Sequence, residues 1–205
     1  MLTERIVVGL LQVNCYVAWN DETRDALIID PGEEPERIAQ RIRRLELMPR
    51  GILLTHGHVD HIRAVPKLVE AYSCPVMLHA NDSSLYHSND NELPPWLPPA
   101  VDLPEPTDVP RDFADLAFDV LHTPGHTPGG CSFYFPRAGL VFSGDTLFQL
   151  GVGRTDLCGG DMDTLLRSVR DVLFSLPAET TVYPGHGDAT TIGYEKRNNP
   201  FVMAD

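Results

Sequence analysis

The chain has 205 residues, 42% apolar and 22% charged, with a formal net charge of −13. This composition fits a globular protein with a substantial core, and we expect a single domain over 1–205. The negative charge argues against a protein that mainly holds nucleic-acid phosphates, and no apolar run reaches the roughly 18 residues of a membrane span. The N-terminus also lacks the basic start and long apolar region of a secretory signal.

The four cysteines, Cys15, Cys74, Cys131 and Cys158, lie far apart and form no C-x-x-C pair. Such spacing is typical of reduced thiols in a cytoplasmic protein, so we expect a cytoplasmic location. Zinc ligation by these cysteines has little support, and the sequence leaves the oligomeric state open.

Short apolar runs alternate with helical periodicity in the N-terminal half. Asp30 follows the third apolar run, where it would serve either as a turn or cap residue or as a group that orients a metal-bound histidine. We predict strands at 6–8, 13–19, 26–29, 51–54 and 75–78, and helices at 35–47 and 62–71.

A dense polar run, THGHVDH at 55–61, begins where one of these strands ends. In extended backbone, residues two apart point the same way, so His56 and His58 can reach one ion together. Asp60 keeps that parity, whereas His61 leaves it and can face a second position nearby. Imidazole and carboxylate suit zinc, iron or manganese, so the run predicts a metal site.

The proline-rich segment 89–110 excludes regular helix and central strand. It is either a stiff surface crossover or a wall or lid beside the site, with Trp96 packing on substrate. After it we predict two short strands within 113–121, strands at 132–135, 140–142 and 181–183, and helices at 161–174 and 191–197.

Three of these later strands end in a metal-type side chain: His126, Asp145 and His186. Together with the run at 55–61, a metal-type side chain follows the end of a predicted strand at four places along the chain. Because strand ends meet at the edge of a sheet, we predict that these side chains share one metal centre.

This ordered set resembles the metallo-β-lactamase superfamily, and within it the short glyoxalase II-like (hydroxyacylglutathione hydrolase-like) hydrolases. The resemblance spans nearly the whole chain. The motifs that carry it are THGHVDH at 55–61, TPGHT at 123–127, GDTLF at 144–148, PGHG at 184–187, NCY at 14–16 and DPG at 30–32.

The resemblance implies an α/β fold, a four-layer αββα sandwich with the site at one edge. It also implies two divalent metal ions, zinc first, with iron or manganese as alternatives. By motif, one metal would be held by His56, His58 and His126, the other by Asp60, His61 and His186, and Asp145 would bridge them.

The resemblance further implies a thioesterase in which a metal-bridging hydroxide, oriented by Asp60, attacks S-lactoylglutathione or a related S-acylglutathione. No dedicated acid is evident outside the ligand set, which suits a thiolate leaving group with a pKa near 8.5. Arg154 is the candidate partner of a substrate carboxylate, or otherwise a surface salt-bridge residue. Fewer than twenty residues follow His186, so Lys196 is expected to replace part of the glutathione binding that longer relatives place in a C-terminal region.

Persulfide dioxygenases resemble the same motifs and are the alternative. They would use one Fe(II), held by His56, His126 and Asp145, and would act on glutathione persulfide. The sequence after His186 looks more like the short hydrolases. RNA-processing and flavodiiron members of the superfamily fit less well, because no basic exosite or flavin domain is evident. Neither reading needs nucleic acid or membrane as a partner.

Overall fold

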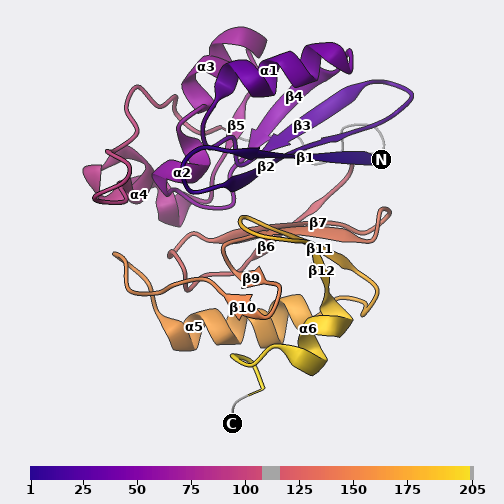
Figure 1. Ribbon diagram of the computed structural model, residues 1–205, viewed down its shortest axis with the longest axis vertical. Coiled ribbons are helices and arrows are strands. Elements are labelled where there is room, and N and C mark those ends of the chain that lie inside the picture. Colours follow the sequence, from indigo (N-terminus) through magenta and orange to yellow (C-terminus); the bar gives the residue numbers. More distant parts are fainter. Residues whose placement is uncertain (108–115, 204–205) are drawn as a thin grey trace.

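Two β-sheets lie face to face, and helices cover the outer face of each sheet (Figure 1). This is the predicted αββα order of layers. The structure is a computed structural model that describes residues 1–107 and 116–203. Within these residues, no helix has both the length and the apolar character needed to cross a membrane.

The first sheet comes from the N-terminal half of the chain and has the order β1-β2-β3-β4-β5. Its first three strands pair antiparallel, and β3, β4 and β5 pair parallel. Every residue of β2 is buried, because helices cover one face of the sheet and the second sheet covers the other. The strands are β1 (Leu2–Val8), β2 (Val13–Trp19), β3 (Asp25–Ile29), β4 (Met48–Leu53) and β5 (Val76–Met77).

Both helices on this sheet differ in extent from their predictions. The predicted helix 35–47 is α1 (Pro35–Arg44), which ends because Glu46 adopts a left-handed conformation with φ 54°. The predicted helix 62–71 is two helices, α2 (Val59–Ile62) and α3 (Val65–Tyr72). Pro66 explains the break, since it lacks an N–H and would clash with the carbonyl of Ile62 in a continuous helix.

The second sheet has the order β12-β11-β8-β7-β6. In the region predicted as two short strands, 113–121, the described part holds one strand, β6, and 113–115 lie outside the described residues. The sheet consists of β6 (Asp119–His122), β7 (Cys131–Phe135), β8 (Leu140–Gly144), β11 (Thr181–Pro184) and β12 (Thr190–Thr191).

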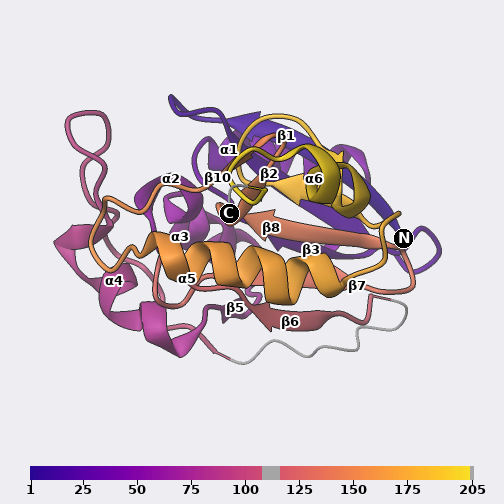
Figure 2. The same cartoon turned by 90° about the horizontal axis from the view of Figure 1, so that it is seen from below.

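A long helical stretch covers the outer face of the second sheet (Figure 2). It starts as α5 (Met162–Arg167), where the Asp161 side chain accepts a hydrogen bond from the Thr164 N–H at 2.7 Å and caps the helix. It continues through a π-helical turn, Ser168–Val172, and a 3-10 turn, Leu173–Ser175, so the predicted helix 161–174 changes its winding partway. The short helix α6 (Ile192–Asn198) lies beside it.

Three short elements, one helix and two strands, belong to neither sheet nor to the helices that cover them. The helix α4 (Ser83–His87) precedes the proline-rich segment, in which Leu93 and Leu97 form an isolated antiparallel bridge. A two-strand hairpin that the sequence pattern did not predict, β9 (Leu147–Phe148) and β10 (Gly151–Val152), follows the second sheet's central strand.

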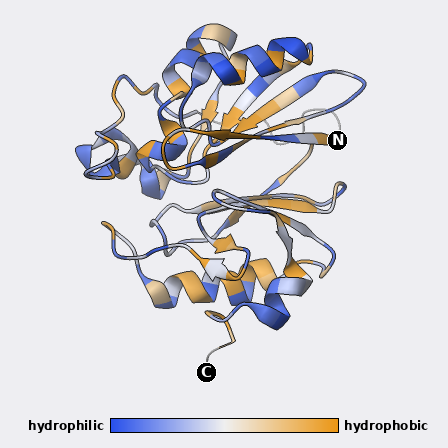
Figure 3. Ribbon diagram, in the orientation of Figure 1, coloured by the Kyte–Doolittle hydropathy of each residue, from blue (hydrophilic) through white to orange (hydrophobic). Residues whose placement is uncertain are grey.

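Apolar residues of both sheets fill the space between them (Figure 3). Tyr16 and Leu27 of the first sheet share one buried cluster with Phe133 and Phe142 of the second, and the rings of Tyr16 and Phe142 lie 5.0 Å apart. The two sheets therefore share one core, which holds their edges, and the loops on those edges, in a fixed relation.

Candidate metal centre

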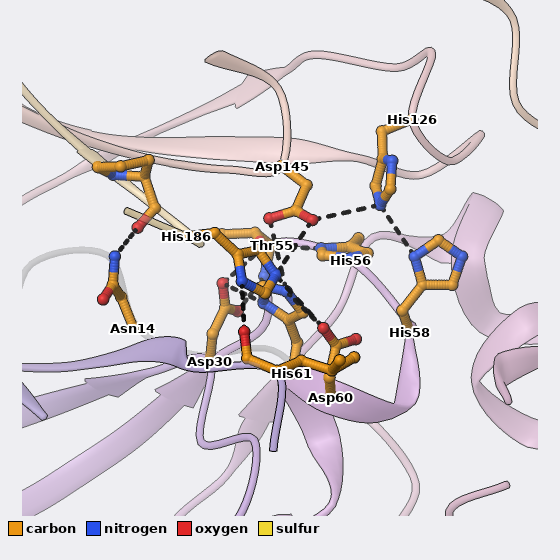
Figure 4. Close-up of polar contacts among 12 residues, drawn as sticks. Asn14, Asp30, Thr55, His56, His58, Asp60, His61, His126, Asp145 and His186 are labelled. Carbon is orange, nitrogen blue, oxygen red and sulfur yellow. Dashed lines mark hydrogen bonds and ion pairs between the residues drawn. The ribbon is translucent and has the colours of Figure 1, made fainter. Parts of the chain in front are cut away.

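Seven histidine and aspartate side chains converge where loops of both sheets meet (Figure 4). The run after β4 supplies four of them, and the loops after β6, β8 and β11 supply one each. Three sets have ligand atoms within 4.8 Å of one another: His56, His58 and His126; His56, His61 and Asp145; and Asp60, His61 and His186. The structure thus brings together every residue of the predicted metal centre.

Asp145 lies between the two outer sets. Its carboxylate oxygens are 3.5 Å from His61 Nε2, 3.7 Å from His126 Nε2 and 3.6 Å from His186 Nε2. A Cβ on Gly185 would collide with this carboxylate, so the glycine leaves the room that brings the β8 and β11 loops together. This position suits a group shared by two cations.

Two histidines have a proton position fixed by a backbone carbonyl. His126 Nδ1 lies 2.7 Å from the Arg154 carbonyl oxygen, and His186 Nδ1 lies 3.1 Å from that of Leu11. A carbonyl can only accept, so each Nδ1 carries the proton. In the neutral ring Nε2 then keeps its lone pair, and both Nε2 atoms face the cluster.

Asp30 fixes two more rings from behind. Its carboxylate accepts hydrogen bonds from the Thr55 N–H at 2.8 Å and the Thr55 hydroxyl at 2.7 Å, and it lies 3.1 Å from His61 Nδ1. Because that hydroxyl donates to Asp30, it accepts from His56 Nδ1 at 3.0 Å. Of the two readings left open for Asp30, this geometry favours the group that orients histidines.

Three polar atoms of this cluster are buried without a hydrogen-bond partner: His56 Nε2, His61 Nε2 and Asp145 Oδ1. Buried polar atoms are nearly always paired, and leaving one unpaired costs about 1–3 kcal/mol. Here all three belong to one candidate set of metal ligands. The donor atoms therefore fit a cation that would complete their coordination.

The electrostatics of the protein without bound metal lead to the same conclusion. Burial lowers the pKa of His56 well below its usual value and that of His58 to about 3, so both rings stay neutral and able to bind metal. Burial also opposes charge on His61, but the carboxylates of Asp60 and Asp145 outweigh it and raise its pKa to about 10. In the metal-free protein a protonated His61 therefore supplies one positive charge beside the Asp60 and Asp145 carboxylates, where a metal ion would supply it in the loaded protein.

A further buried carboxylate, Asp82, braces the loops of the first histidine set. Asp82 is fully buried and follows β5 through a short 3-10 turn. It accepts hydrogen bonds from the Gly57 N–H at 3.0 Å, the Thr127 hydroxyl at 2.8 Å and the Gly129 N–H at 2.5 Å. Gly57 lies between His56 and His58, and Thr127 follows His126, so one carboxylate connects both loops.

Asn14 connects the first sheet to the turn that carries His186. Its side-chain amide donates to the Pro184 carbonyl at 3.0 Å and the Gly187 carbonyl at 2.9 Å. The Tyr16 hydroxyl donates to the same Pro184 carbonyl at 2.8 Å. These bonds give Asn14 and Tyr16 of the NCY motif a structural role, because they hold the end of β11 against β2.

A cavity of about 400 Å³ opens over the cluster. Arg154 lines it, yet the guanidinium makes a two-point ion pair with Asp156, at 2.6 and 2.7 Å, so both predicted roles of Arg154 have a structural basis. Lys196 is not among the described residues that line the cavity, and its ammonium lies 5.8 Å from the centre of the Phe174 ring. The expectation that Lys196 binds substrate finds no support in this geometry.

The proline-rich segment contributes a wall to this cavity through Leu93. Leu93 packs with Val59, which lies within the 55–61 run, and with Leu97. Trp96, by contrast, is 55% exposed and is absent from the described lining. The prediction of a wall is therefore supported, whereas the stacking of Trp96 on substrate is not.

Sequence reasoning found the converging histidines and aspartates because each follows a strand. It missed Asp82, which also comes after a strand, the two-residue β5, but stands alone without a histidine motif. It also missed the apolar lining of the cavity, which comes from loops that are distant in sequence.

The chain belongs to the metallo-β-lactamase superfamily, whose family model matches residues 8–186. Among curated relatives, it is 39% identical to the hydroxyacylglutathione hydrolase GloC of Haemophilus influenzae, with 98% of each chain covered. It is 42% identical to a Bacillus subtilis protein named "probable metallo-hydrolase YqgX", again with 98% of both chains covered.

Solved structures show the same fold. The chain superposes on the BLEG-1 B3 metallo-β-lactamase with a TM-score of 0.91 and 37% identity, covering 99% of this chain and all of that one. For TTHA1623 in a di-iron-bound form the TM-score is 0.84 at 43% identity, over 97% and 99% of the two chains. For ETHE1 of Myxococcus xanthus it is 0.78 at 34% identity, over 98% and 84%. These relatives support a metal-binding centre and leave the metal and the substrate open.

Proposed function

We propose that this protein is a binuclear metal-dependent thioesterase acting on S-lactoylglutathione or a related S-acylglutathione in the cytoplasm. The observation that carries the proposal is the pair of complete ligand sets on either side of Asp145. One metal ion would be held by His56, His58 and His126, and the other by Asp60, His61 and His186, with Asp145 shared. Zinc is the first choice, with iron or manganese as alternatives.

When bound, the metal ions would lower the pKa of a coordinated water towards roughly 7 and polarise the thioester carbonyl. Asp60 has an oxygen that lies 3.4 Å from His186 Nε2 and lines the cavity. Burial opposes charge on this carboxyl, but His61 and His186 outweigh it and lower its pKa to about 2. Asp60 is therefore ionised at neutral pH and can orient the attacking water by accepting a hydrogen bond from it.

We propose a thioester rather than an amide as the substrate because of the leaving group. A thiolate with a pKa near 8.5 departs without a strong general acid. The described groups that line the cavity include one cation, Arg154, which half faces solvent at the rim. We assign Arg154 to a substrate carboxylate, which would exchange with Asp156. The similarity to the hydroxyacylglutathione hydrolase GloC supports glutathione as the thiol.

The alternative is a mononuclear Fe(II) persulfide dioxygenase acting on glutathione persulfide. Its metal would be held by His56, His126 and Asp145. The similarity to a protein solved in a di-iron-bound form supports iron as a candidate metal, although that protein holds two irons. The second ligand set favours the hydrolase, because Asp60, His61 and His186 are buried or half-buried. Asp30 orients His61, and the Leu11 carbonyl orients His186.

The test is the turnover of S-lactoylglutathione by His58→Ala and by a matched control, His87→Ala. His87 lies at the end of α4 and pairs with Glu105 at 3.4 Å, away from the cluster. We expect His58→Ala to lose metal and nearly all turnover while its far-UV circular dichroism matches the wild type, and His87→Ala to keep both. Full activity in His58→Ala would show that the site assignment is wrong.

A further inference from the structure

The cavity over the metal centre is walled by hydrocarbon. Apart from the candidate ligands and Arg154, its described lining consists of Leu11, Leu93, Phe148, Val152 and Leu157. Its volume of about 400 Å³ is at the lower end of the range for pockets that hold small organic molecules, about 300–1,000 Å³. These apolar side chains therefore provide most of the surface that a bound substrate could contact.

The wall has two parts, and the part that contains Phe148 reaches the reacting centre. Leu11 and Leu157 pack around the buried cluster that contains Leu93, so three side chains from distant loops form one surface. On the other side, the Phe148 ring meets the His186 ring edge-on, with centroids 6.2 Å apart. A group attached to a carbonyl at the metal centre would therefore lie against this wall.

The glutathione part of a substrate does not match the same surface. The tripeptide carries two carboxylates and an ammonium, and burying such groups without partners is costly. Among the described residues of the lining, Arg154 is the one arginine or lysine, and it is already paired with Asp156 at the rim. The net charge of −13 also opposes the binding of thioesters that carry more negative charge than an S-acylglutathione. The thiol part therefore fits the solvent side of the cavity, next to Arg154.

We propose that the apolar wall binds the acyl group, so that among S-acylglutathiones the protein cleaves esters of unsubstituted hydrocarbon acids faster than esters of hydroxy acids such as lactate. This inference rests on the proposed thioesterase function and narrows its substrate class. Each methylene buried against the wall contributes a factor of about four to the specificity constant.

The experiment compares kcat/KM of the metal-loaded enzyme for the S-acetyl, S-propanoyl, S-butanoyl and S-hexanoyl esters of glutathione. S-lactoylglutathione is included because it differs from the S-propanoyl ester by one hydroxyl. We expect kcat/KM to rise about fourfold per methylene, and the S-propanoyl ester to be preferred over the S-lactoyl ester once their alkaline hydrolysis rates are taken into account.

Substitutions in the apolar wall test whether it causes the dependence of kcat/KM on acyl chain length. Val152→Thr changes polarity with little change of shape, and Leu157→Asn does the same with a similar volume. Both should flatten the chain-length series. Val101→Thr is the matched control, because Val101 is 69% exposed and is outside the described lining; its series should equal that of the wild type.

A binding measurement separates this inference from the proposed function. S-hexylglutathione and S-methylglutathione are thioethers without a carbonyl, so their affinities are measured by calorimetry whether or not thioesters are cleaved. We expect the hexyl compound to bind at least tenfold more tightly. Fast hydrolysis with a flat acyl series and equal affinities would overturn the inference and leave the thioesterase intact. No hydrolysis of any thioester, with the hexyl compound still preferred, would overturn the thioesterase and leave the apolar site. No hydrolysis and no preference would overturn both.

Discussion

At the scale of single residues, the site is defined by groups that hold the histidines as much as by the histidines themselves. A backbone carbonyl fixes the proton on His126 and on His186, and Asp30 does the same for His61. Such partners set both the orientation of a ring and the nitrogen that is free to bind metal. Loss of such a hydrogen bond should therefore weaken metal binding even though every metal-ligating residue is still present.

Asp82 offers the sharpest residue-scale test. In Asp82→Asn, one amide oxygen must replace two carboxylate oxygens, and the new NH2 group faces the N–H donor of either Gly57 or Gly129, because these two donors bind different carboxylate oxygens. We expect the free energy of unfolding to fall by about 1–3 kcal/mol. In calorimetric titrations, one of two metal-binding events should weaken, because Asp82 braces the loops of the first histidine set.

The control for this variant is Asp90→Asn, since Asp90 is exposed and lies in the 3-10 turn Asn89–Asn91, outside these loops. Its stability and its two metal-binding events should equal those of the wild type. An Asp82→Asn protein that behaves like this control would show that the carboxylate does not support the site.

The stability of the metal-free protein should depend on pH through His61. Its pKa is raised from 6.5 to about 10, because the Asp60 and Asp145 carboxylates outweigh burial. The folded protein thus keeps a proton that the unfolded chain has released above pH 6.5. The stabilisation is complete below pH 6.5 and is lost as the pH rises towards 10. Burial also lowers the pKa of His186, but Asp145 and Asp60 together outweigh it and raise the pKa, so His186 acts in the same direction.

Urea unfolding of chelator-treated protein at pH 6.5 and pH 9 measures this effect. We expect the free energy of unfolding to be lower at pH 9, and the difference to shrink when the protein is loaded with metal, since coordination replaces the proton on His61. A metal-free protein that is equally stable or more stable at pH 9 would contradict the assigned charge state.

At the scale of elements, the centre depends on strands that end at a common edge. β8 and β11 pair in parallel, so Asp145 and His186 follow neighbouring strand ends. In the first sheet, β4 ends just before the run at 55–61. Val13 of β2 and His186 form an isolated bridge between the two sheets. The relation between sheets thus sets the distance between the two ligand sets.

Asn14→Ala tests this relation between elements. The variant loses two hydrogen bonds from β2 to the turn that carries His186 and leaves the Pro184 and Gly187 carbonyls with fewer donors. We expect a loss of about 1–3 kcal/mol of unfolding free energy and weaker binding of one metal, the one assigned to Asp60, His61 and His186. Metal titration and thermal unfolding provide the readouts.

Asn198→Ala serves as the control, because the Asn198 amide donates to the Tyr194 carbonyl within α6, on an exposed surface. It removes a side-chain to backbone bond of the same type. The proposed role of Asn14 would be refuted by equal metal affinities in the two variants.

The sequence permitted prediction of local patterns but not of features that need distant partners. Strands and the ligands after them were predictable, because alternation of apolar runs and turn residues is local. The break between α2 and α3 has a local cause in Pro66, and the prediction of one helix over 62–71 underrated it. The change of winding after Arg167 and the β9–β10 hairpin have no such local signal. The brace made by Asp82 and the hold of Asn14 on β11 join residues 25 to 173 positions apart, and no local pattern reports such contacts.

At the scale of the whole molecule, the candidate centre lies across both sheets. His56, His58, Asp60 and His61 come from the first sheet, and His126, Asp145 and His186 from the second. The sheets already share an apolar core, so metal removal should lower the unfolding temperature without unfolding the protein. The cavity above the centre is likewise assembled from loops of both halves.

The most direct test of the central claim is the metal content of anaerobically purified protein, measured together with hydrolysis of S-lactoylglutathione. The account predicts about two metal ions per chain and rapid cleavage of the thioester, both lost on chelation and restored on reloading. One iron per chain, negligible hydrolysis and oxygen uptake with glutathione persulfide would contradict it and identify the dioxygenase instead.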